Sequence, residues 1–392
     1  MSMAPQVTDG LLKGITILDL SRVLAGPFAT MILANLGARV IKVEIPGTGD
    51  DSRAFGPFSN GKSLYYSAIN CNKESIALNL KNAGDLAIFH KLAAKADVLV
   101  ENYRPGTMEK LGLGWDVLHA RYPRLVYGAA SGFGDSGPFS QRAAYDIVVQ
   151  GMGGIMSLTG YPDSPPARVG VSIGDMAAGL YLAIGINAAL YRRTITGKGC
   201  KIDIAMLDCQ VAILEDAITS YAKTGVIPGR LGTRHPTVAP FQAYKAKDGH
   251  FIIAAGNDHL FGLLTEVLGR PDLATDPRFK TNDLRHDNVD ALQTEIEKAL
   301  ASRTVSDWID ALDAKGVPCS RINDIPHVMA DPQVAARHMV VSVNDPVAGQ
   351  IKVAGNPIKI VGMAEPTTFR PAPGLDADRS SILAEIAGES DE

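Results

Sequence analysis

The sequence has 392 residues, of which 46% are hydrophobic and 20% are charged, and its formal net charge is −4. This length and apolar content predict two domains, each with a core of its own. The slightly acidic balance and the absence of a long basic run argue against a nucleic-acid partner and favour a small-molecule ligand.

The first third of the sequence alternates between runs typical of buried strands and runs typical of helices. Strands are predicted at residues 14–20, 39–46, 75–80, 97–103 and 124–130, and helices at 24–38, 84–96 and 108–121. Strands joined by helices of this length form a parallel sheet with helices on its faces, so the predicted fold class is α/β with a doubly wound sheet.

Three loops follow the carboxyl ends of these strands, which is where ligands bind in doubly wound sheets. They span residues 21–27, 102–105 and 131–138. The first loop contains no G-x-G-x-x-G motif, so a nicotinamide or flavin dinucleotide has no specific support. We expect a different small ligand at this edge of the sheet.

A single acid, Asp175, stands immediately before a long run of small and apolar residues. Arg193 in the last turn and Gly197 as a stop predict a helix over residues 176–194, and its apolar residues on several sides predict burial in a core. A membrane span is the alternative, but the run is shorter than the roughly 20 residues a bilayer needs and contains Asn187. On local grounds Asp175 is expected to cap this helix.

The rest of the chain contains the signals of a second domain. The predicted elements are a strand at 200–206, a helix at 208–223, a Gly- and Pro-rich linker at 225–236, a hairpin at 241–256, helices through 312 and a strand at 349–360. The predicted division is 1–224 for the N-terminal part of the large domain, 225–330 for the small domain with its linkers, and 331–392 for a C-terminal segment that returns to the large domain.

The cysteines and the N-terminal residues carry no sign of a secreted or metal-binding protein. The four cysteines form no C-x-x-C pair and have no histidine at metal-ligand spacing, so neither disulfides nor a metal site is predicted. The stretch MSMAPQVTDGLLKG lacks the charged and apolar regions of a signal peptide, so a cytoplasmic location is expected.

Seven stretches of the sequence match one family in order. They are LDLSRVLAGPFATMILANLGARVIKVE, NCNKESIALNLK, ENYRPGTMEKLGL, GFGDSGP, YDIVVQGMGG, GVSIGDMAAGLYLAIGINAAL and TGKG. The chain resembles the family III CoA-transferases from about Leu11 to about Pro371. The resemblance implies a Rossmann-like large domain, a smaller α+β domain, and a homodimer of interlocked rings. It also implies acyl-CoA and small carboxylic acids as substrates, with no tightly bound cofactor and no membrane partner.

In that family the acid of the GD motif is the nucleophile, and Asp175 is the matching residue. The resemblance implies that this carboxylate attacks an acyl-CoA to give an anhydride, and that CoA then returns to form an aspartyl-CoA thioester. A helix N-terminus is expected to keep the carboxylate ionised at neutral pH, and only the ionised form attacks a thioester. Backbone N–H groups near Gly174–Met176 are candidate donors to the oxyanion.

The resemblance also carries over residues that contact CoA. They are Leu24, Ala25, Leu78, Lys81, Asn102, Tyr103, Arg104 and Lys110. Cations suit the phosphates of the nucleotide, although Lys81 and Lys110 are also typical of a solvated surface. One arginine that contacts CoA in some relatives is Ile45 here.

Two other functions remain open at this stage: a 2-methylacyl-CoA racemase and a non-catalytic CoA-binding protein. Racemases of the family carry a histidine base where this chain has Tyr145, and tyrosine, with a pKa of about 10, is a poor base at neutral pH. The formyl-CoA transferases close a glycine-rich lid over the site. The comparable AAGND stretch here has Gly256 and Asn257 but lacks that run of glycines, which leaves the lid in doubt.

The stretch GTRHPTVAPFQAYKAKDGHFIIAAGND looks more like the succinyl-CoA:glutarate type than the formyl-CoA type, which suggests dicarboxylate acceptors. A second carboxylate needs a cationic anchor. The candidate anchors are Arg53, Arg168, Arg234, His235 and His259.

Overall fold

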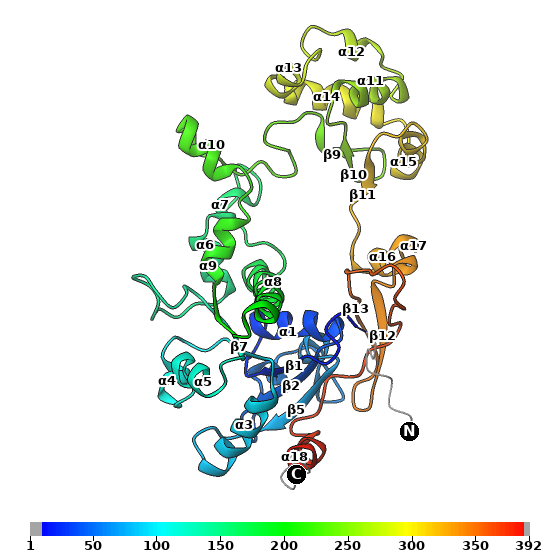
Figure 1. Cartoon of the computed structure of the whole chain (residues 1–392). Helices are drawn as coiled ribbons and strands as arrows, with labels where there is room; N and C mark the ends of the chain where they lie inside the picture. The colour runs from blue at the N-terminus through cyan, green and yellow to red at the C-terminus, as the bar shows by residue number, and fades with distance from the viewer. Residues whose placement is uncertain (1–9, 388–392) are drawn as a thin grey trace. The chain divides into compact units, whose positions relative to one another are not determined.

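The computed structural model describes residues 10–387, which form two compact units. Within these residues, the first unit comprises 10–156, 168–225 and 332–387, and the second comprises Ser157–Ala167 and Val226–Asp331. The first unit therefore combines residues from both ends of the chain (Figure 1). The segment Ser157–Ala167 belongs to the second unit, whereas the sequence prediction placed it in the large domain.

The first unit is built on a six-stranded parallel sheet. Across the sheet the strands are β5 (Lys73–Ala77), β2 (Arg39–Glu44), β1 (Thr16–Asp19), β6 (Val98–Glu101), β7 (Val126–Ser131) and β8 (Lys201–Ala205). In chain order this is 3-2-1-4-5-6, the arrangement of dinucleotide-binding Rossmann sheets. The order reverses between β1 and β6, so the crevice for a ligand is expected beyond the carboxyl ends of these two strands.

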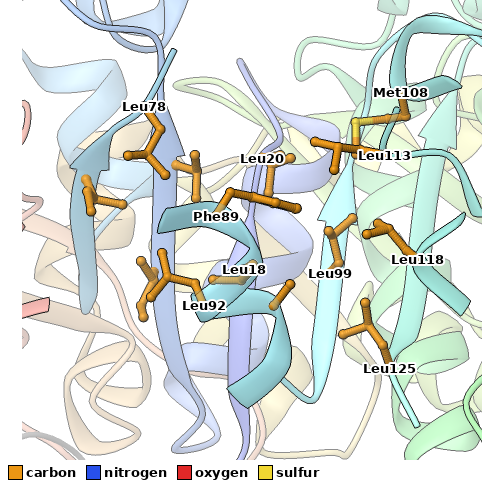
Figure 2. Close-up of a cluster of buried hydrophobic side chains, with 14 of the residues drawn as sticks. Leu18, Leu20, Leu78, Phe89, Leu92, Leu99, Met108, Leu113, Leu118 and Leu125 are labelled. Atoms are coloured by element: carbon orange, nitrogen blue, oxygen red, sulfur yellow. The ribbon is translucent and has the colours of Figure 1, made fainter. Parts of the chain in front are cut away.

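Alternate residues of the strands face two separate cores. One face, drawn in Figure 2, packs Leu18, Leu99 and other strand residues against Phe89 of α3 (Ala83–Lys95) and Leu118 of α5 (Trp115–Arg121). The C-terminal helix α18 (Arg379–Ala387) covers this same face. Full burial of one such leucine contributes about 1.5–3 kcal/mol.

The other face is covered by α1 (Ala25–Asn35) and α8 (Ile173–Thr196), which pack on each other. Their contact is close at Gly179, where an added Cβ would lie 2.8 Å from the carbonyl oxygen of Ala25. Within the described residues, α8 is the one helix long and apolar enough to cross a membrane, but half of that apolar window is buried. The prediction of a core helix fits this burial.

The two ends of α8 differ in how well the sequence predicted them. Gly197 adopts the left-handed conformation at the C-terminus, as predicted. The N-terminus begins at Ile173 with Ser172 as its N-cap, so Asp175 is the third residue of the helix. The expectation that Asp175 caps the helix is therefore wrong.

The remaining elements of the first unit connect and flank the sheet. They are the short helix η1 (Asp51–Ala54), β3 (Phe58–Ser59), β4 (Lys62–Ser63), α2 (Leu64–Ile69), α4 (Thr107–Lys110), α6 (Asp146–Met152), α9 (Met206–Ala212), α10 (Ala217–Thr224), α17 (Pro332–Ala336), β12 (Val340–Asp345) and β13 (Gly349–Ala354). The helix α7 (Ile155–Leu158) spans the boundary between the units.

Three predicted elements differ from the structure. The helix expected at 108–121 is interrupted at Gly112, whose φ of 70° is left-handed, and the helix expected at 208–223 is interrupted before α10, where Glu215 has a φ of 52°. The strand expected at 349–360 ends at Ala354 and pairs antiparallel with β12. Left-handed positions break a helix without disturbing its apolar pattern, which is why periodicity did not reveal them.

The second unit has its own three-stranded antiparallel sheet and its own core. Its strands are β9 (Phe241–Lys245), β10 (His250–Ala254) and β11 (Cys319–Arg321), and its helices are α11 (Asp258–Val267), α12 (Asp272–Thr275), α13 (Asn282–Asp287), α14 (Val289–Leu300), α15 (Val305–Asp313) and α16 (Ile325–Ala330). The predicted hairpin is the β9–β10 pair.

Candidate functional site

A pocket of about 250 Å³ lies in the first unit, at the carboxyl ends of the sheet strands. Its walls come from the loops that follow β1, β6 and β7, together with Asp175 of α8 and Met206 of α9. Five of the eight residues predicted to contact CoA line it: Leu24, Ala25, Asn102, Tyr103 and Arg104. The fold therefore brings the predicted nucleophile and most of the predicted CoA contacts into one pocket.

Asp175 is half-buried, and no hydrogen bond within residues 10–387 reaches its carboxylate. Burial and the charge of Asp146 together raise the pKa of Asp175 to about 7. Sequence reasoning expected the helix N-terminus to keep this acid ionised, and the structure corrects that expectation. The N–H of Gly174 in the first turn is occupied by Asp146, and burial and the charge of this acid oppose any stabilisation of the ionised form by the helix N-terminus.

Asp146 ties α6 to the first turn of α8. It is buried, and its Oδ1 accepts a hydrogen bond of 2.8 Å from the N–H of Gly174. Its Oδ2 accepts one of 2.7 Å from Nε2 of Gln150, and Oε1 of Gln150 accepts one of 2.9 Å from the N–H of Val169. Nη2 of Arg168 lies 3.9 Å from the same Oδ2. Asp146 and Gln150 thus fix the backbone that precedes Asp175, and the negative charge of Asp146 favours a protonated Asp175.

The loop after β1 is held in a strained conformation by buried charges. Val23 has a φ of 67°, which is costly for a β-branched residue, and its N–H donates to Oδ1 of Asp50 at 3.0 Å. Nζ of Lys42 lies 2.8 Å from Oδ2 of Asp50 and donates to the carbonyl of Ser21 at 2.8 Å. Both charged side chains are buried, so the loop has a rigid base.

The loops after β1 and β6 are joined by Asn102. Its Nδ2 donates to the carbonyl of Arg22, and its Oδ1 accepts from the N–H of Arg22, both at 2.7 Å. The Arg22 guanidinium lies 5.4 Å from the ring centroid of Tyr103 and pairs with Asp51 at 3.1 Å. The side-chain amide of Asn102 is therefore already used to join the two loops.

Three predicted CoA contacts lie outside the pocket lining. Leu78 is buried in the sheet core, and Lys81 and Lys110 are exposed. Ile45, which replaces an arginine of some relatives, is exposed as well. None of these four residues lies within the pocket that contains Asp175.

The predicted anchors for a second carboxylate have different surroundings. Arg53 pairs with Glu44 at 2.6 Å and also donates to Tyr66 and to the carbonyl of Pro373, so it is committed. Arg234 pairs with Asp290 at 2.5 Å within the second unit. Arg168 belongs to the first unit, and its side chain is 46% exposed beside Asp146.

The histidines and the AAGND stretch belong to the second unit. The imidazole of His235 accepts from the N–H of Thr237, and His259 is exposed on α11. Asn257 caps α11 by accepting from the N–H of Leu260, and Asp258 pairs with Arg285 at 2.7 Å. The side chains of this stretch therefore secure a helix N-terminus.

Sequence reasoning missed several residues of the site. Tyr65 on α2 is close enough to Asp175 for the charge of that acid, together with burial, to raise the pKa of Tyr65 to about 12. Arg22 and Arg142 line the pocket. Arg22 lies in a predicted ligand loop, so its position was a usable signal, whereas nothing near Tyr65 in the sequence marks it. Tyr145 also lines the pocket and is 78% exposed.

A larger cavity of about 950 Å³ lies elsewhere in the first unit. Its cationic lining residues include Lys62, paired with Asp345 at 2.5 Å, and Lys73, paired with Asp19 at 3.0 Å. These cations are committed to structural pairs, and the carboxylate of the lining, Asp378, accepts a hydrogen bond of 2.8 Å from the N–H of Ser75. We therefore place the functional site in the smaller pocket, on chemical grounds.

The model of CoA-transferase family III matches residues 12–379, and the chain belongs to this family. It is a CoA-transferase, an enzyme that uses CoA thioesters as substrates. Acetyl-CoA:oxalate CoA-transferase of Acetobacter aceti is 46% identical over 384 residues, which cover 98% of this chain and 97% of that protein. Succinyl-CoA:glutarate CoA-transferase of Homo sapiens is 40% identical over 376 residues, with coverage of 96% and 86%.

A crystal structure of a CAIB/BAIF family protein from Brucella suis has the same fold. It aligns with a TM-score of 0.85 at 39% identity and covers 96% of this chain and 100% of that one. The α/β fold with a parallel central sheet is thus confirmed. Membership of a transferase family sets aside the non-catalytic CoA-binding alternative.

Proposed function

We propose that this enzyme transfers CoA from an acyl-CoA to a dicarboxylic acid, with Asp175 as the covalent nucleophile. The observation that carries the proposal is the shared pocket, in which Asp175 faces the loops that hold Leu24, Ala25, Asn102, Tyr103 and Arg104. A carboxylate without a hydrogen-bond partner within residues 10–387 has its lone pairs available for attack.

The proposed reaction consists of two acyl exchanges and their reversal. The Asp175 carboxylate attacks the thioester carbonyl, the C–S bond breaks, and CoA leaves as a thiolate while a mixed anhydride forms. The thiolate then attacks the aspartyl carbonyl, which releases the donor acid as a carboxylate and leaves an aspartyl-CoA thioester. The acceptor carboxylate repeats these steps in reverse order. The free energy of the thioester is kept on the protein throughout.

The raised pKa of Asp175 has a direct consequence for this reaction. Near neutral pH a fraction of the enzyme carries a protonated Asp175, which cannot attack. Desolvation that raises the pKa also makes the ionised carboxylate a stronger nucleophile, because less water has to be removed from it. Activity should therefore rise as the pH increases through about 7.

For the substrates, we propose succinyl-CoA as donor and a C4 to C6 dicarboxylate as acceptor, with oxalate included in the test. The relatives named above are transferases of oxalate and glutarate, which supports a dicarboxylate class. Arg168 is the proposed anchor of the second carboxylate, because it is exposed and lies beside Asp146 in the same unit as Asp175. Arg22 and Arg104 are proposed to bind the phosphates of CoA, since both line the pocket.

We also propose a homodimer of interlocked subunits, as the family resemblance implies. The exposed side of α8 supports an interface, because it carries a row of large apolar side chains at helical spacing: Leu180, Ile184, Tyr191 and Ile195. Such a continuous apolar row is typical of a surface covered by a partner. Light scattering of the purified protein should give twice the mass of the chain, and a monomer would contradict the proposal.

The nucleophile is tested by mass spectrometry after incubation with succinyl-CoA alone. The wild-type chain should gain the mass of CoA less one water, as a thioester at Asp175, and Asp175→Ala should gain nothing. A wild-type chain without an adduct, combined with strictly sequential kinetics, would overturn the covalent mechanism. No observation favours racemase activity, because Tyr145 occupies the position of the base.

A further inference from the structure

The side chain of Gln210 on α9 is the most unusual buried polar group near the site. It is fully buried, and neither its oxygen nor its nitrogen has a hydrogen-bond partner among residues 10–387. Buried amides are normally paired, because an unpaired one lowers the stability of the folded state. Such an exception calls for a functional explanation.

The surroundings of Gln210 connect it to the nucleophile. A Cβ added at Gly153 would lie 2.5 Å from Cβ of Gln210, so this glycine leaves room for the side chain. A Cβ added at Gly174 would lie 3.7 Å from Nε2 of Gln210 and 3.0 Å from Oδ1 of Asp146. The amide and the carboxylate therefore flank the same peptide, one residue before Asp175.

The other neighbours of Gln210 give no reason for an amide at this position. The cluster formed by α6, α8 and α9 is apolar and includes Val149, Ala178 and Cys209. An apolar side chain of similar length would fill the same space and leave no polar atom unpaired. Stability alone would favour the apolar residue.

Oδ1 of Asp146 accepts one hydrogen bond, from Gly174, and has capacity for a second. The Gln210 amide lies on the same side of the Gly174 peptide, with Nε2 3.7 Å from a Cβ added there. We propose that Gln210 is a positioning residue for Asp175, and that its amide donates to Asp146 during the covalent steps. This second bond holds Asp146, and through it the Gly174 peptide, while groups of changing size and charge are attached to Asp175. The inference rests on the proposed covalent function.

The test is Gln210→Met, which keeps the length of the side chain and removes both polar atoms. We expect kcat to fall about tenfold, the effect of one hydrogen bond lost in the reacting state, with KM for succinyl-CoA within about twofold of wild type. The Tm should stay the same or rise, because an unpaired amide has been removed. Lower activity in an equally or more stable protein is a result that a merely structural role does not give.

Tyr244→Phe serves as the matched control. The Tyr244 hydroxyl is also buried and unpaired among residues 10–387, but it lies in the core of the second unit. Its removal should raise or preserve Tm and leave kcat unchanged. Gln210→Leu also removes both polar atoms, with a slightly shorter side chain, so its kcat should fall about as far as that of Gln210→Met.

A wild-type kcat in either Gln210 variant would overturn the proposal, as would a fall in kcat matched by a fall in Tm. If Gln210→Met does not fold, the kcat of Gln210→Leu decides alone. The CoA adduct of the wild type separates this inference from the proposed function. With no adduct on the wild-type chain the covalent mechanism itself fails, whereas an adduct with unchanged variants refutes only the role of Gln210.

Discussion

Two groups of acids in the first unit show opposite electrostatic arrangements. Asp19 and Asp50 are fully buried beneath the loop after β1, and each is paired with a buried lysine, Lys73 at 3.0 Å and Lys42 at 2.8 Å. Their pKa values are lowered by those cations and by hydrogen bonds, against the opposing effect of burial. Asp175 is less buried, has no such partner among residues 10–387, and has a raised pKa.

The difference between the paired and unpaired carboxylates fits the role proposed for each. A paired carboxylate is stabilised in one position and has no lone pair to spare, so it suits the support of a strained loop. A carboxylate without a cation retains its nucleophilicity, and its ionised form is a less stable ground state. The chain thus neutralises Asp19 and Asp50 and leaves Asp175, the proposed nucleophile, without a cation, although all three lie at the same edge of the sheet.

The largest expected effect is that of Asp175→Ala on catalysis. Transfer from succinyl-CoA should fall by about 10⁴-fold or more, because Asp51, which also lines the pocket, is exposed and paired with Arg22. The same substitution should stabilise the folded protein. The pKa of Asp175 is raised from 3.8 to about 7, so ionisation destabilises the folded state as the pH rises through that range.

The Tm difference between Asp175→Ala and wild type should therefore grow in favour of the variant from pH 5 to pH 8. Thermal melts of both proteins across this range measure it. A variant that is less stable than wild type at pH 8 would show that Asp175 has a stabilising partner after all, and would remove the contrast with Asp50.

The second prediction concerns the paired group. Asp50→Ala leaves the buried charge of Lys42 without its partner and removes the acceptor of the Val23 N–H. Breaking a buried pair on one side costs about 3–5 kcal/mol, so the Tm should fall by many degrees. Chemical denaturation at pH 7 checks it, with the exposed acid Asp216 mutated to alanine as control.

A fall of less than about 1 kcal/mol in Asp50→Ala would mean that the loop does not depend on this pair. The direction in which this contribution to stability changes with pH follows from the pKa of Asp50. Because the pKa of Asp50 is lowered in the folded state, its contribution is present at neutral pH and is lost as the pH falls through the folded value. The same acidification should reduce the penalty that Asp175 imposes.

The contrast between these acids also shows what could be predicted from the sequence. Strand positions and the parallel sheet followed from apolar runs that any local reading detects, and the ligand loops followed from the sheet itself. The motif identified Asp175, and the chain order placed Leu24, Ala25 and Tyr103 at the same edge. Local patterns and one family resemblance were sufficient for these features.

The state of the nucleophile depends on residues far from it in the sequence. Asp146 raises the pKa of Asp175 and occupies the Gly174 N–H, but nothing in the stretch GVSIGDMAAG indicates either contact. Similarly, Asn102 joins the loop of Arg22 through contacts between two loops about 80 residues apart. Such contacts exist only in the folded protein. Sequence reasoning therefore expected the helix dipole to keep Asp175 ionised, whereas burial outweighs the dipole and raises its pKa.

A third prediction asks whether Arg168, an exposed cation beside Asp146, binds the substrate. Arg168→Met should lower kcat/KM for glutarate by about one to two orders of magnitude, because a charge-assisted hydrogen bond is lost. Valerate, which has one carboxylate on the same number of carbons, should be transferred equally by both proteins. Arg192→Met, a change of an exposed arginine at the far end of α8, is the control and should alter neither rate.

An equal loss of kcat/KM for glutarate and valerate would show that Arg168 acts on Asp146 or binds CoA, and that it does not bind the second carboxylate. If wild type itself transfers CoA to glutarate and valerate with equal efficiency, the site reads a single carboxylate. The dicarboxylate proposal would then fail while the covalent mechanism stands.

The smallest expected effect comes from making the two groups of acids more alike. Asp146→Asn removes the negative charge beside Asp175, so the pKa of Asp175 should fall and the acidic limb of kcat/KM for succinyl-CoA should move to lower pH. The displacement should be roughly one pH unit or less, because burial is the larger cause and remains.

The asparagine Oδ1 can still accept from Gly174, whereas the bond from Gln150 to Oδ2 is lost, so the plateau rate should fall modestly. A pH profile from 5 to 9 separates the two effects. A limb that stays in place, or moves upward, would show that Asp146 acts on the position of the α8 turn alone and that burial by itself sets the ionisation of the nucleophile.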